Sequence, residues 1–276
     1  MKLDGVLAFV AIMSAGLASA KTVAWWRFEG TPGATAPTEI ANSVADSTIP
    51  ALTVASIKTL KFGSDADFMP KFVAPSPKAL KVYDPVSKSC VANASSLRLR
   101  DSREANPLKN GCAYTDAGKL PLKGDFTIEC FFRIPDAEEV SNLAFAPILT
   151  IQAAGYVDTS IQINKGKLYC RAFPKDASGA KMAAIVKTRM ASLGDKWHHV
   201  AMTYSAAGHR FSWFLDYKLL DSKSPDGMSG IFVPEGTKFL IGANGLVGGR
   251  NYPGEVDEVR VSDEELKPTE FLHFTE

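Results

Sequence analysis

The sequence predicts an all-β protein, a two-sheet antiparallel β-sandwich with few short helical turns. Apolar and polar residues alternate at period two in short runs such as Phe126–Ile134, and turn residues separate these runs at regular intervals. Runs with helical periodicity are nearly absent, since only Glu138–Phe145 and Leu266–Phe274 suit a short helical turn. Regularly spaced short strands of this kind are typical of sandwiches and barrels.

The N-terminal segment has the pattern of a secretory signal peptide. Lys2 precedes an apolar run from Gly5 to Leu17, and small residues follow at Ala18-Ser19-Ala20. We therefore expect residues 1–20 to be removed and residues 21–276 to form one domain, which is secreted into the periplasm or the extracellular space. No later apolar run is long enough to span a bilayer, so no membrane insertion is expected after cleavage.

The strand signals are weaker in the first half of the chain than in the second. Prolines at 70, 75 and 77 interrupt any long ladder between residues 52 and 80. The remainder up to Gly118 looks mostly loop-like. Strands are expected at Val23–Phe28, Ala79–Tyr83, Ser96–Arg100, Phe126–Ile134, Ile148–Gln152, Thr159–Asn164, Lys167–Phe173 and Met182–Thr188.

Six blocks in the second half carry a likeness to a known family: Phe126-Thr127-Ile128-Glu129, Lys196-Trp197-His198-His199-Val200-Ala201, Trp213–Leu219, Leu240–Ala243, Gly254–Val261 and Leu266–Phe271. Together they resemble the strands and the short tail of laminin-G-like jelly rolls of the concanavalin A-like type. The likeness covers roughly residues 120–272, and Tyr217 stands where that family usually has Gly, at a turn that favours positive φ. The resemblance implies a jelly-roll fold and carbohydrate recognition.

The closing block contains the acids that an enzyme on this fold would use. Glucanases on related jelly rolls carry a Glu-x-Asp-x-Glu strand, which places three acids on one face. Here Glu255 and Asp257 are followed by Val259 at the third position, and Glu258 is expected on the opposite face. No complete catalytic set is present, and Val256, Val259 and Val261 are expected to pack the sandwich.

Histidines and acids give no local metal-binding pattern. His198 and His199 are adjacent in a strand, so their side chains leave on opposite faces and cannot chelate one metal together. Asp65, Asp67 and the loop from Asp221 to Asp226 offer oxygens without an EF-hand pattern. No cofactor is expected, although calcium held by scattered loop residues stays open.

Four cysteines in an exported chain are candidates for disulfides. Cys90 and Cys112 bracket a turn-rich stretch, so a local bridge between them is the simplest pairing. Cys130 and Cys170 lie in strand-like runs, where they would bridge neighbouring strands or stay buried thiols.

Aromatic and polar loop residues are the candidate ligand contacts, because flat rings stack on sugars while amides and acids bond their hydroxyls. At least one of Trp25 and Trp26 is expected to face the core. The net charge of +1 gives no support for nucleic acid as a partner. The residues expected to bind ligand are Asp216, Tyr217, Asn244, Arg250, Asn251 and Tyr252.

The sequence thus predicts a secreted, non-catalytic binding module for carbohydrate or another extracellular ligand. Two alternatives remain open. One is a polysaccharide-degrading enzyme, a glycoside hydrolase or lyase, whose site is assembled from distant strands. The other is an adhesion or structural protein that binds an extracellular protein partner.

Overall fold

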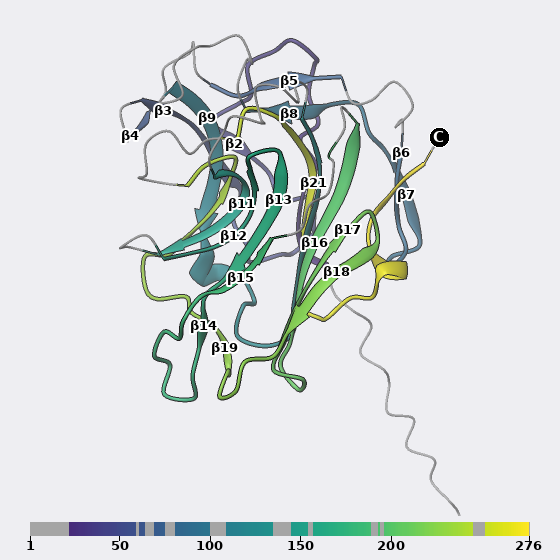
Figure 1. The fold of residues 1–276 in the computed structure, drawn as a ribbon. Helices are drawn as coiled ribbons and strands as arrows, with labels where there is room; N and C mark the ends of the chain where they lie inside the picture. The colour runs from purple at the N-terminus through teal and green to yellow at the C-terminus, as the bar shows by residue number, and fades with distance from the viewer. Residues whose placement is uncertain are drawn as a thin grey trace, which may run out of the picture.

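The computed structural model has three layers, with two large antiparallel sheets face to face and a small sheet outside one of them (Figure 1). The structure describes residues 22–58, 61–63, 69–74, 81–99, 109–134, 145–153, 157–188, 193, 196–244 and 252–275. The two large sheets confirm the expected two-sheet antiparallel β-sandwich.

The first sheet, sheet A, has the strand order β18-β17-β16-β10-β21-β8-β5, and β1 also pairs with β21. Its central strand β10 pairs with β16 on one side and β21 on the other. The strands of sheet A are β1 (Thr22–Trp26), β5 (Lys71–Val73), β8 (Ser96–Arg98), β10 (Phe126–Arg133), β16 (Trp197–Ser205), β17 (Arg210–Leu215), β18 (Lys218–Lys223) and β21 (Glu255–Ser262).

The second sheet, sheet B, has the order β15-β13-β12-β11-β20-β9-β3-β2, and β4 also pairs with β3. Both halves of the chain contribute to both sheets. The strands of sheet B are β2 (Glu39–Ile40), β3 (Leu52–Lys58), β4 (Lys61–Gly63), β9 (Lys109–Asp116), β11 (Ala146–Ala153), β12 (Val157–Asn164), β13 (Lys167–Ala172), β15 (Ile185–Thr188) and β20 (Lys238–Ile241).

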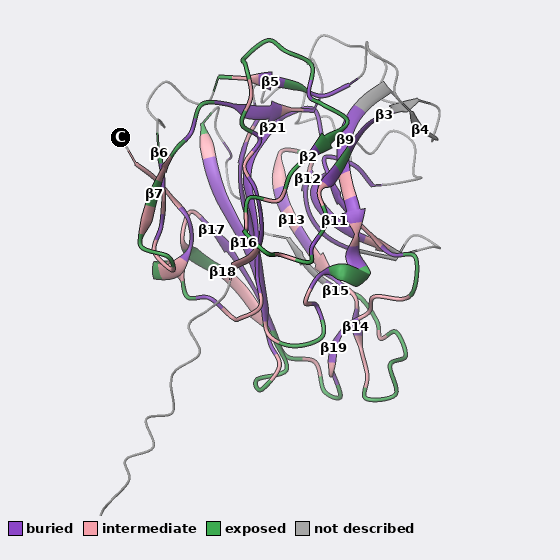
Figure 2. Cartoon of the chain, turned by 180° about the vertical axis from the view of Figure 1, so that it is seen from behind, coloured by how far each residue is buried: buried purple, intermediate pink, exposed green. Residues whose placement is uncertain are grey.

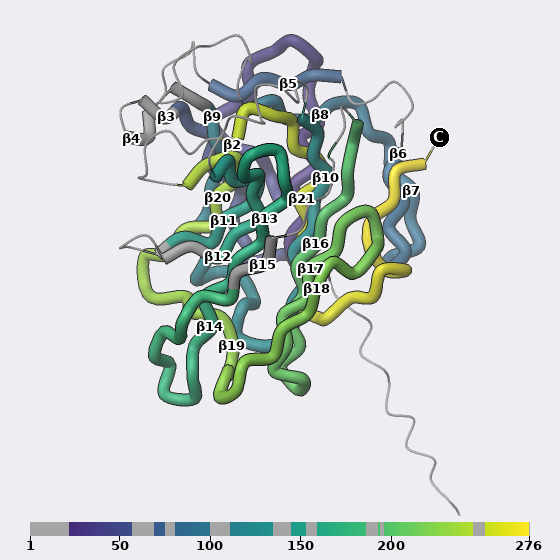
Figure 3. The backbone as a smooth tube through the Cα atoms, viewed as in Figure 1, coloured from purple at the N-terminus to yellow at the C-terminus, as the bar shows by residue number. Residues whose placement is uncertain are grey.

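Two smaller sheets and two short 3-10 helices complete the described fold. Strands β22 (His273–Thr275), β6 (Lys81–Asp84) and β7 (Ser89–Ala92) form sheet C, which lies on the side of sheet A away from sheet B in both views (Figures 1 and 2). Strands β14 (Pro174–Lys175) and β19 (Gly230–Ile231) form a two-stranded sheet at the opposite end from β5 (Figure 3). The helices are η2 (Ala117–Lys119) and η3 (Pro268–Glu270).

The core between sheets A and B follows from the period-two pattern. Phe126, Ile128, Cys130 and Phe132 of β10 all belong to the main hydrophobic cluster. The closing-strand valines Val256, Val259 and Val261 are fully buried in the same cluster, as predicted. Trp26 also lies there, while Trp25 belongs to a second cluster beneath sheet C.

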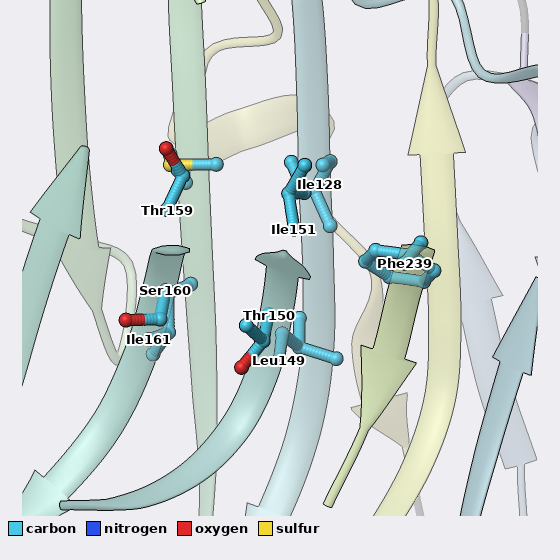
Figure 4. A pocket seen from close by; sticks show the side chains of 9 residues that line it. Ile128, Leu149, Thr150, Ile151, Thr159, Ser160, Ile161 and Phe239 are labelled. Carbon is cyan, nitrogen blue, oxygen red and sulfur yellow. The ribbon is translucent and has the colours of Figure 1, made fainter. Parts of the chain in front are cut away.

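Between the two sheets, the cavity shown in Figure 4 is too small for a ligand. This cavity has a volume of about 10 Å³, which is room for about one water molecule. Ile128, Ile151 and Phe239 line it, whereas the hydroxyl groups of Thr150 and Ser160 are directed away from Ile128 (Figure 4).

Strand β9 was not expected, because Asn110-Gly111 resembles a turn. In the structure Gly111 is part of the strand and is needed for close approach, since a Cβ there would lie 2.5 Å from Cδ of Pro70. The Gly111 amide also donates to the Leu99 carbonyl, at 2.8 Å. Gly111 therefore marks close packing of two chain segments rather than a reversal.

Two other segments differ from their predicted roles. The strand predicted at Ala79–Tyr83 is present as β6, but it belongs to sheet C rather than to the sandwich. The helical turn predicted within Leu266–Phe274 is limited to η3, after which the chain forms β22. The predicted turn at Glu138–Phe145 lies almost wholly outside the described residues.

The expected local disulfide is absent, and all four cysteines are free thiols. Cys90 lies in sheet C and Cys112 in sheet B, so proximity in sequence does not bring them together. Cys130 and Cys170 are buried in the sandwich core from opposite sheets. Burial raises the pKa values of the Cys112, Cys130 and Cys170 thiols.

The signal-peptide residues 1–20 lie outside the described part of the chain, so their removal stays a prediction. Among the described residues, no helix has the length and apolar character needed to cross a bilayer.

Candidate functional site

The acidic strand β21 contains a bulge that changes where its carboxylates point. Opposite β10, the register shifts between Glu129 and Phe131, and Glu258 has φ +51. Glu258 therefore accepts a hydrogen bond from Nε1 of Trp25, on the same side of sheet A as Asp257. The expectation that Glu258 leaves on the opposite face is wrong, because the extra residue resets the alternation.

The bulge gathers the acids, but it does not expose them. Glu255, Asp257 and Glu258 have at most 1% of their surface exposed. Burial and the Glu258 charge raise the pKa of Asp257 well above its ordinary value, and burial raises the pKa of Glu258 to about 8. Asn93 donates to Asp257 at 3.0 Å, from the segment that follows β7.

Sheet C and the C-terminal segment cover this face of sheet A through a buried ion network. Arg260 donates to Glu129 at 2.7 Å, to Asp84 of β6 at 2.6 Å and to the Glu270 carbonyl at 2.7 Å. Glu129 also contacts Nε2 of His199 at 2.7 Å. Burial opposes ionisation of Glu129, but Arg260 and His199 outweigh it and lower its pKa. These acids and cations hold two layers together.

The predicted contacts Asp216 and Tyr217 form the turn between β17 and β18. Asp216 accepts hydrogen bonds from Nδ1 of His198 and from the His199 amide, at 2.9 and 3.0 Å. The Tyr217 ring stacks between His199 and His273, and its hydroxyl donates to the Leu272 carbonyl. Both side chains keep some exposed surface, and their role in binding stays a prediction.

Two other predicted contacts, Tyr252 and Asn244, are buried. Tyr252 has no exposed surface and donates its hydroxyl to the Arg133 carbonyl at 2.6 Å, so its ring is part of the core and is not available for stacking on a sugar. Asn244 is 3% exposed and follows β20 of sheet B. Arg250 and Asn251 lie outside the described residues.

The described residues contain no group of three His, Cys, Asp or Glu side chains arranged to hold a metal ion. Asp65 and Asp67 are not among the described residues, and Asp221 lies 3.4 Å from Nζ of Lys223. Calcium binding therefore stays an untested prediction, and the described residues provide no site for it.

An open groove lies instead at the end of the molecule that carries β14 and β19. Its volume is about 310 Å³, within the range of small-ligand sites. Its walls are the segment 117–123, the β14 turn and residues 231–234, three parts of the chain that sequence reasoning did not connect. The groove is lined by Ala117, Gly118, Leu120, Leu122, Lys123, Lys175, Gly179, Ile231, Phe232, Val233 and Pro234.

The groove has an apolar base and a mixed rim. Leu120, Leu122 and Ile231 are at most 5% exposed, whereas Phe232 is partly exposed and Lys123 is exposed. No carboxylate is among the lining residues. This combination of apolar surface, an accessible ring and a few polar groups is the usual make-up of a ligand site.

The β14–β19 pairing fixes the shape of the groove. Lys175 pairs with Gly230, which has φ +146, and a Cβ there would lie 3.0 Å from Cε of Lys175. The absence of a side chain at Gly230 thus lets the Lys175 stem lie across the neighbouring strand. The Phe232 amide donates to the Phe173 carbonyl at 2.9 Å and continues the ladder to the rim.

Two further hollows lie in the described structure. One, of about 430 Å³, is lined by residues 44–49 together with Val23, Lys119 and Pro121. The other, of about 450 Å³, is lined by residues 224–229 together with Ala177 and His209. Neither is lined by an aromatic Phe, Tyr or Trp ring, which distinguishes both from the groove beside Phe232.

Solved structures share this fold at low sequence identity. The binding domain of botulinum neurotoxin serotype D has a TM-score of 0.52 at 9% identity, over 90% of this chain and 50% of that one. Domain 4 of AbnA, a GH43 extracellular arabinanase from Geobacillus stearothermophilus solved with arabinotriose, has a TM-score of 0.51 at 10% identity, over 91% of this chain and 97% of that one.

A botulinum neurotoxin type C structure, whose cell entry is described as dependent on two ganglioside molecules, has a TM-score of 0.50 at 13% identity. It covers 91% of this chain and 50% of that one, so this chain spans about half the length of the neurotoxin domains. No curated protein sequence matches the chain.

The family model described as the Concanavalin A-like lectin/glucanases superfamily matches residues 109–271. This segment includes β10, β16 and β21, the strands at the centre of sheet A, and extends over more than half of the sequence. The chain belongs to the concanavalin A-like lectin/glucanase superfamily.

Proposed function

We propose that this protein is a secreted, non-catalytic carbohydrate-binding module and that the groove beside β14 and β19 receives the sugar. The observation that carries the proposal is the Phe232 ring at the rim of a 310 Å³ groove with an apolar base. Ring faces stack on the apolar faces of sugars, and the lysine ammonium groups supply hydrogen-bond donors for hydroxyl oxygens.

The structural neighbours support the same ligand class. The arabinanase domain was solved with arabinotriose, and a neurotoxin neighbour is described with gangliosides. Both neighbours have low sequence identity to this chain, so the proposal for this chain depends on the groove itself.

The enzyme alternative has less support from the geometry. Two carboxylates that cleave a glycosidic bond must both face the substrate. Glu255, Asp257 and Glu258 are buried, and the groove is lined by no Asp or Glu. Binding without bond cleavage is therefore the function that this groove suits.

The test is binding of the purified chain to an array of neutral and acidic plant, microbial and animal glycans, followed by titration calorimetry with the best ligand. Phe232→Ala should weaken binding at least tenfold, because one sugar-stacking ring is lost. Tyr83→Ala, at a partly exposed ring in sheet C, is the matched control and should bind like the parent protein.

Two results would overturn the proposal. One is an array on which no glycan is bound by a folded protein. The other is a glycan whose affinity is unchanged by Phe232→Ala, because that ligand would occupy a different surface.

A further inference from the structure

We infer that the groove selects negatively charged sugars, with Lys123 and Lys175 contacting a carboxylate or sulfate group on the ligand. This inference rests on the proposed function, because it names the class of sugar that the same groove would take.

Lys123 and Lys175 are the only charged side chains among the lining residues. Neither ammonium group has an ion-pair or hydrogen-bond partner within the part of the chain that the structure describes. An ammonium group beside apolar surface, with no carboxylate near it in the same groove, attracts an anion more strongly than an ion already paired would.

Two acids beside the groove, Asp116 and Asp176, are engaged by their own turns. Asp116 accepts the Gly118 amide at 2.9 Å, which forms the cap of η2. Asp176 accepts hydrogen bonds from the Ser178 hydroxyl at 2.6 Å and from the amides of Ser178 and Ala180 at 2.9 and 3.0 Å, and these hydrogen bonds lower its pKa. Neither carboxylate lines the groove, so neither neutralises the two lysines from within it.

Other cations extend the positive region on the β14 side. Lys181 forms an isolated bridge with Lys175, and its ammonium lies 5.4 Å from the centre of the Phe173 ring. The guanidinium of Arg171 lies 5.1 Å from the same ring. An anionic ligand approaching the groove therefore meets positive charge on the rim and beside it.

The position of Lys175 is built into the backbone. Its stem lies against Gly230, where the positive φ and the missing Cβ leave the necessary room. The Lys175 carbonyl is held in addition by the Ser229 amide at 2.8 Å. The ammonium is thus carried by β14, while Lys123 comes from the segment 117–123.

The experiment uses the full chain and titration calorimetry with defined trisaccharides. The probes are galacturonate, mannuronate and guluronate trimers, their methyl-esterified forms, a sulfated galactan trimer, and neutral galactose and arabinose trimers. Methyl esterification removes the charge and keeps the sugar backbone, so each ester is a matched control for its acid. The carboxylate and sulfate probes distinguish the two sources of negative charge.

We expect at least one charged trimer to bind at least tenfold more tightly than its uncharged form, with an affinity that falls as salt is raised. Lys123→Gln and Lys175→Gln should each weaken that binding about tenfold, because each loses one charge-assisted contact. Lys71→Gln, at an exposed lysine of β5 at the other end of the molecule, should leave the affinity unchanged.

Failure of this inference can be told from failure of the proposed function. Binding of neutral trimers as tight as that of charged ones, with no effect of the two lysine substitutions, overturns the charge selection and leaves carbohydrate binding in place. If the protein binds none of the trimers and no glycan on the array, both the charge selection and the proposed function are overturned. Circular dichroism of each variant confirms that it is folded.

Discussion

Tyr217 shows how contacts hold a residue at an unfavourable backbone angle. Asp216 and Tyr217 have φ values of +47 and +66, which are the angles of a two-residue hairpin turn that usually contains Asn-Gly. Positive φ costs a residue other than glycine about 1–2 kcal/mol. Stacking of the Tyr217 ring on His199 and His273, at 4.8 and 4.5 Å between ring centres, offsets that cost.

Glu258 gives a prediction about pH. Its pKa is about 8 in the folded protein, above its ordinary value of 4.5, so the native state binds this proton more tightly than the unfolded chain. The stability it contributes is complete below about pH 4.5 and is lost as the pH rises through about 8. Glu258→Gln, which stays neutral, should reduce the fall in the free energy of unfolding between pH 5 and 9, and Asp257, whose pKa is also raised, accounts for part of the fall that remains.

Guanidinium unfolding at pH 5, 7 and 9 measures this effect. Glu265→Gln is the control, because its carboxylate forms a surface pair with Arg210 at 2.8 Å rather than a buried contact. That variant should keep the pH dependence of the parent protein. A Glu258→Gln variant with an undiminished alkaline loss would show that Glu258 does not cause it.

Among the elements, β21 joins two layers. Its valines pack against sheet B, while Arg260 on its other face binds Asp84 of sheet C and Glu129 of β10. The same guanidinium holds the Glu270 carbonyl, and the Leu272 amide donates to Glu129 at 3.0 Å. The Arg260 guanidinium and the Glu129 carboxylate therefore both attach the C-terminal segment to sheet A.

Arg260→Met should lower the free energy of unfolding by about 3–5 kcal/mol, because it leaves the Glu129 and Asp84 carboxylates buried without their counter-ion. Arg210→Met, at the exposed pair with Glu265, should cost at most about 1 kcal/mol. Urea unfolding measures both. A loss for Arg260→Met no larger than that for Arg210→Met would mean that the network does not hold the layers.

For the whole molecule, the alternation of apolar and polar residues predicted the sheet architecture better than it predicted the candidate functional site. β10 and the valines of β21 could be assigned to the core because each strand has a distinct buried face. Strand β9 was missed because Asn110-Gly111 is typical of a turn, whereas in the structure this glycine allows the strand to pack closely against Pro70. Glu258 was misplaced because a bulge, which leaves no fixed mark in sequence, resets the alternation.

The groove could not be found from sequence for a related reason. Its residues come from three segments that are far apart in the chain, and no one of them carries a motif. Phe232 and Lys175 become neighbours only through the β14–β19 register. Tyr252, in contrast, was expected in a loop and is buried in the core.

The most direct test of the account maps ligand contact by amide chemical shifts in ¹⁵N-labelled protein, titrated with the trisaccharide that binds best. The largest shifts are expected at residues 117–123, 174–179 and 230–234, around the groove. Shifts concentrated at the Asp216-Tyr217 turn, or on the outer face of sheet B, with none around the groove, would contradict it.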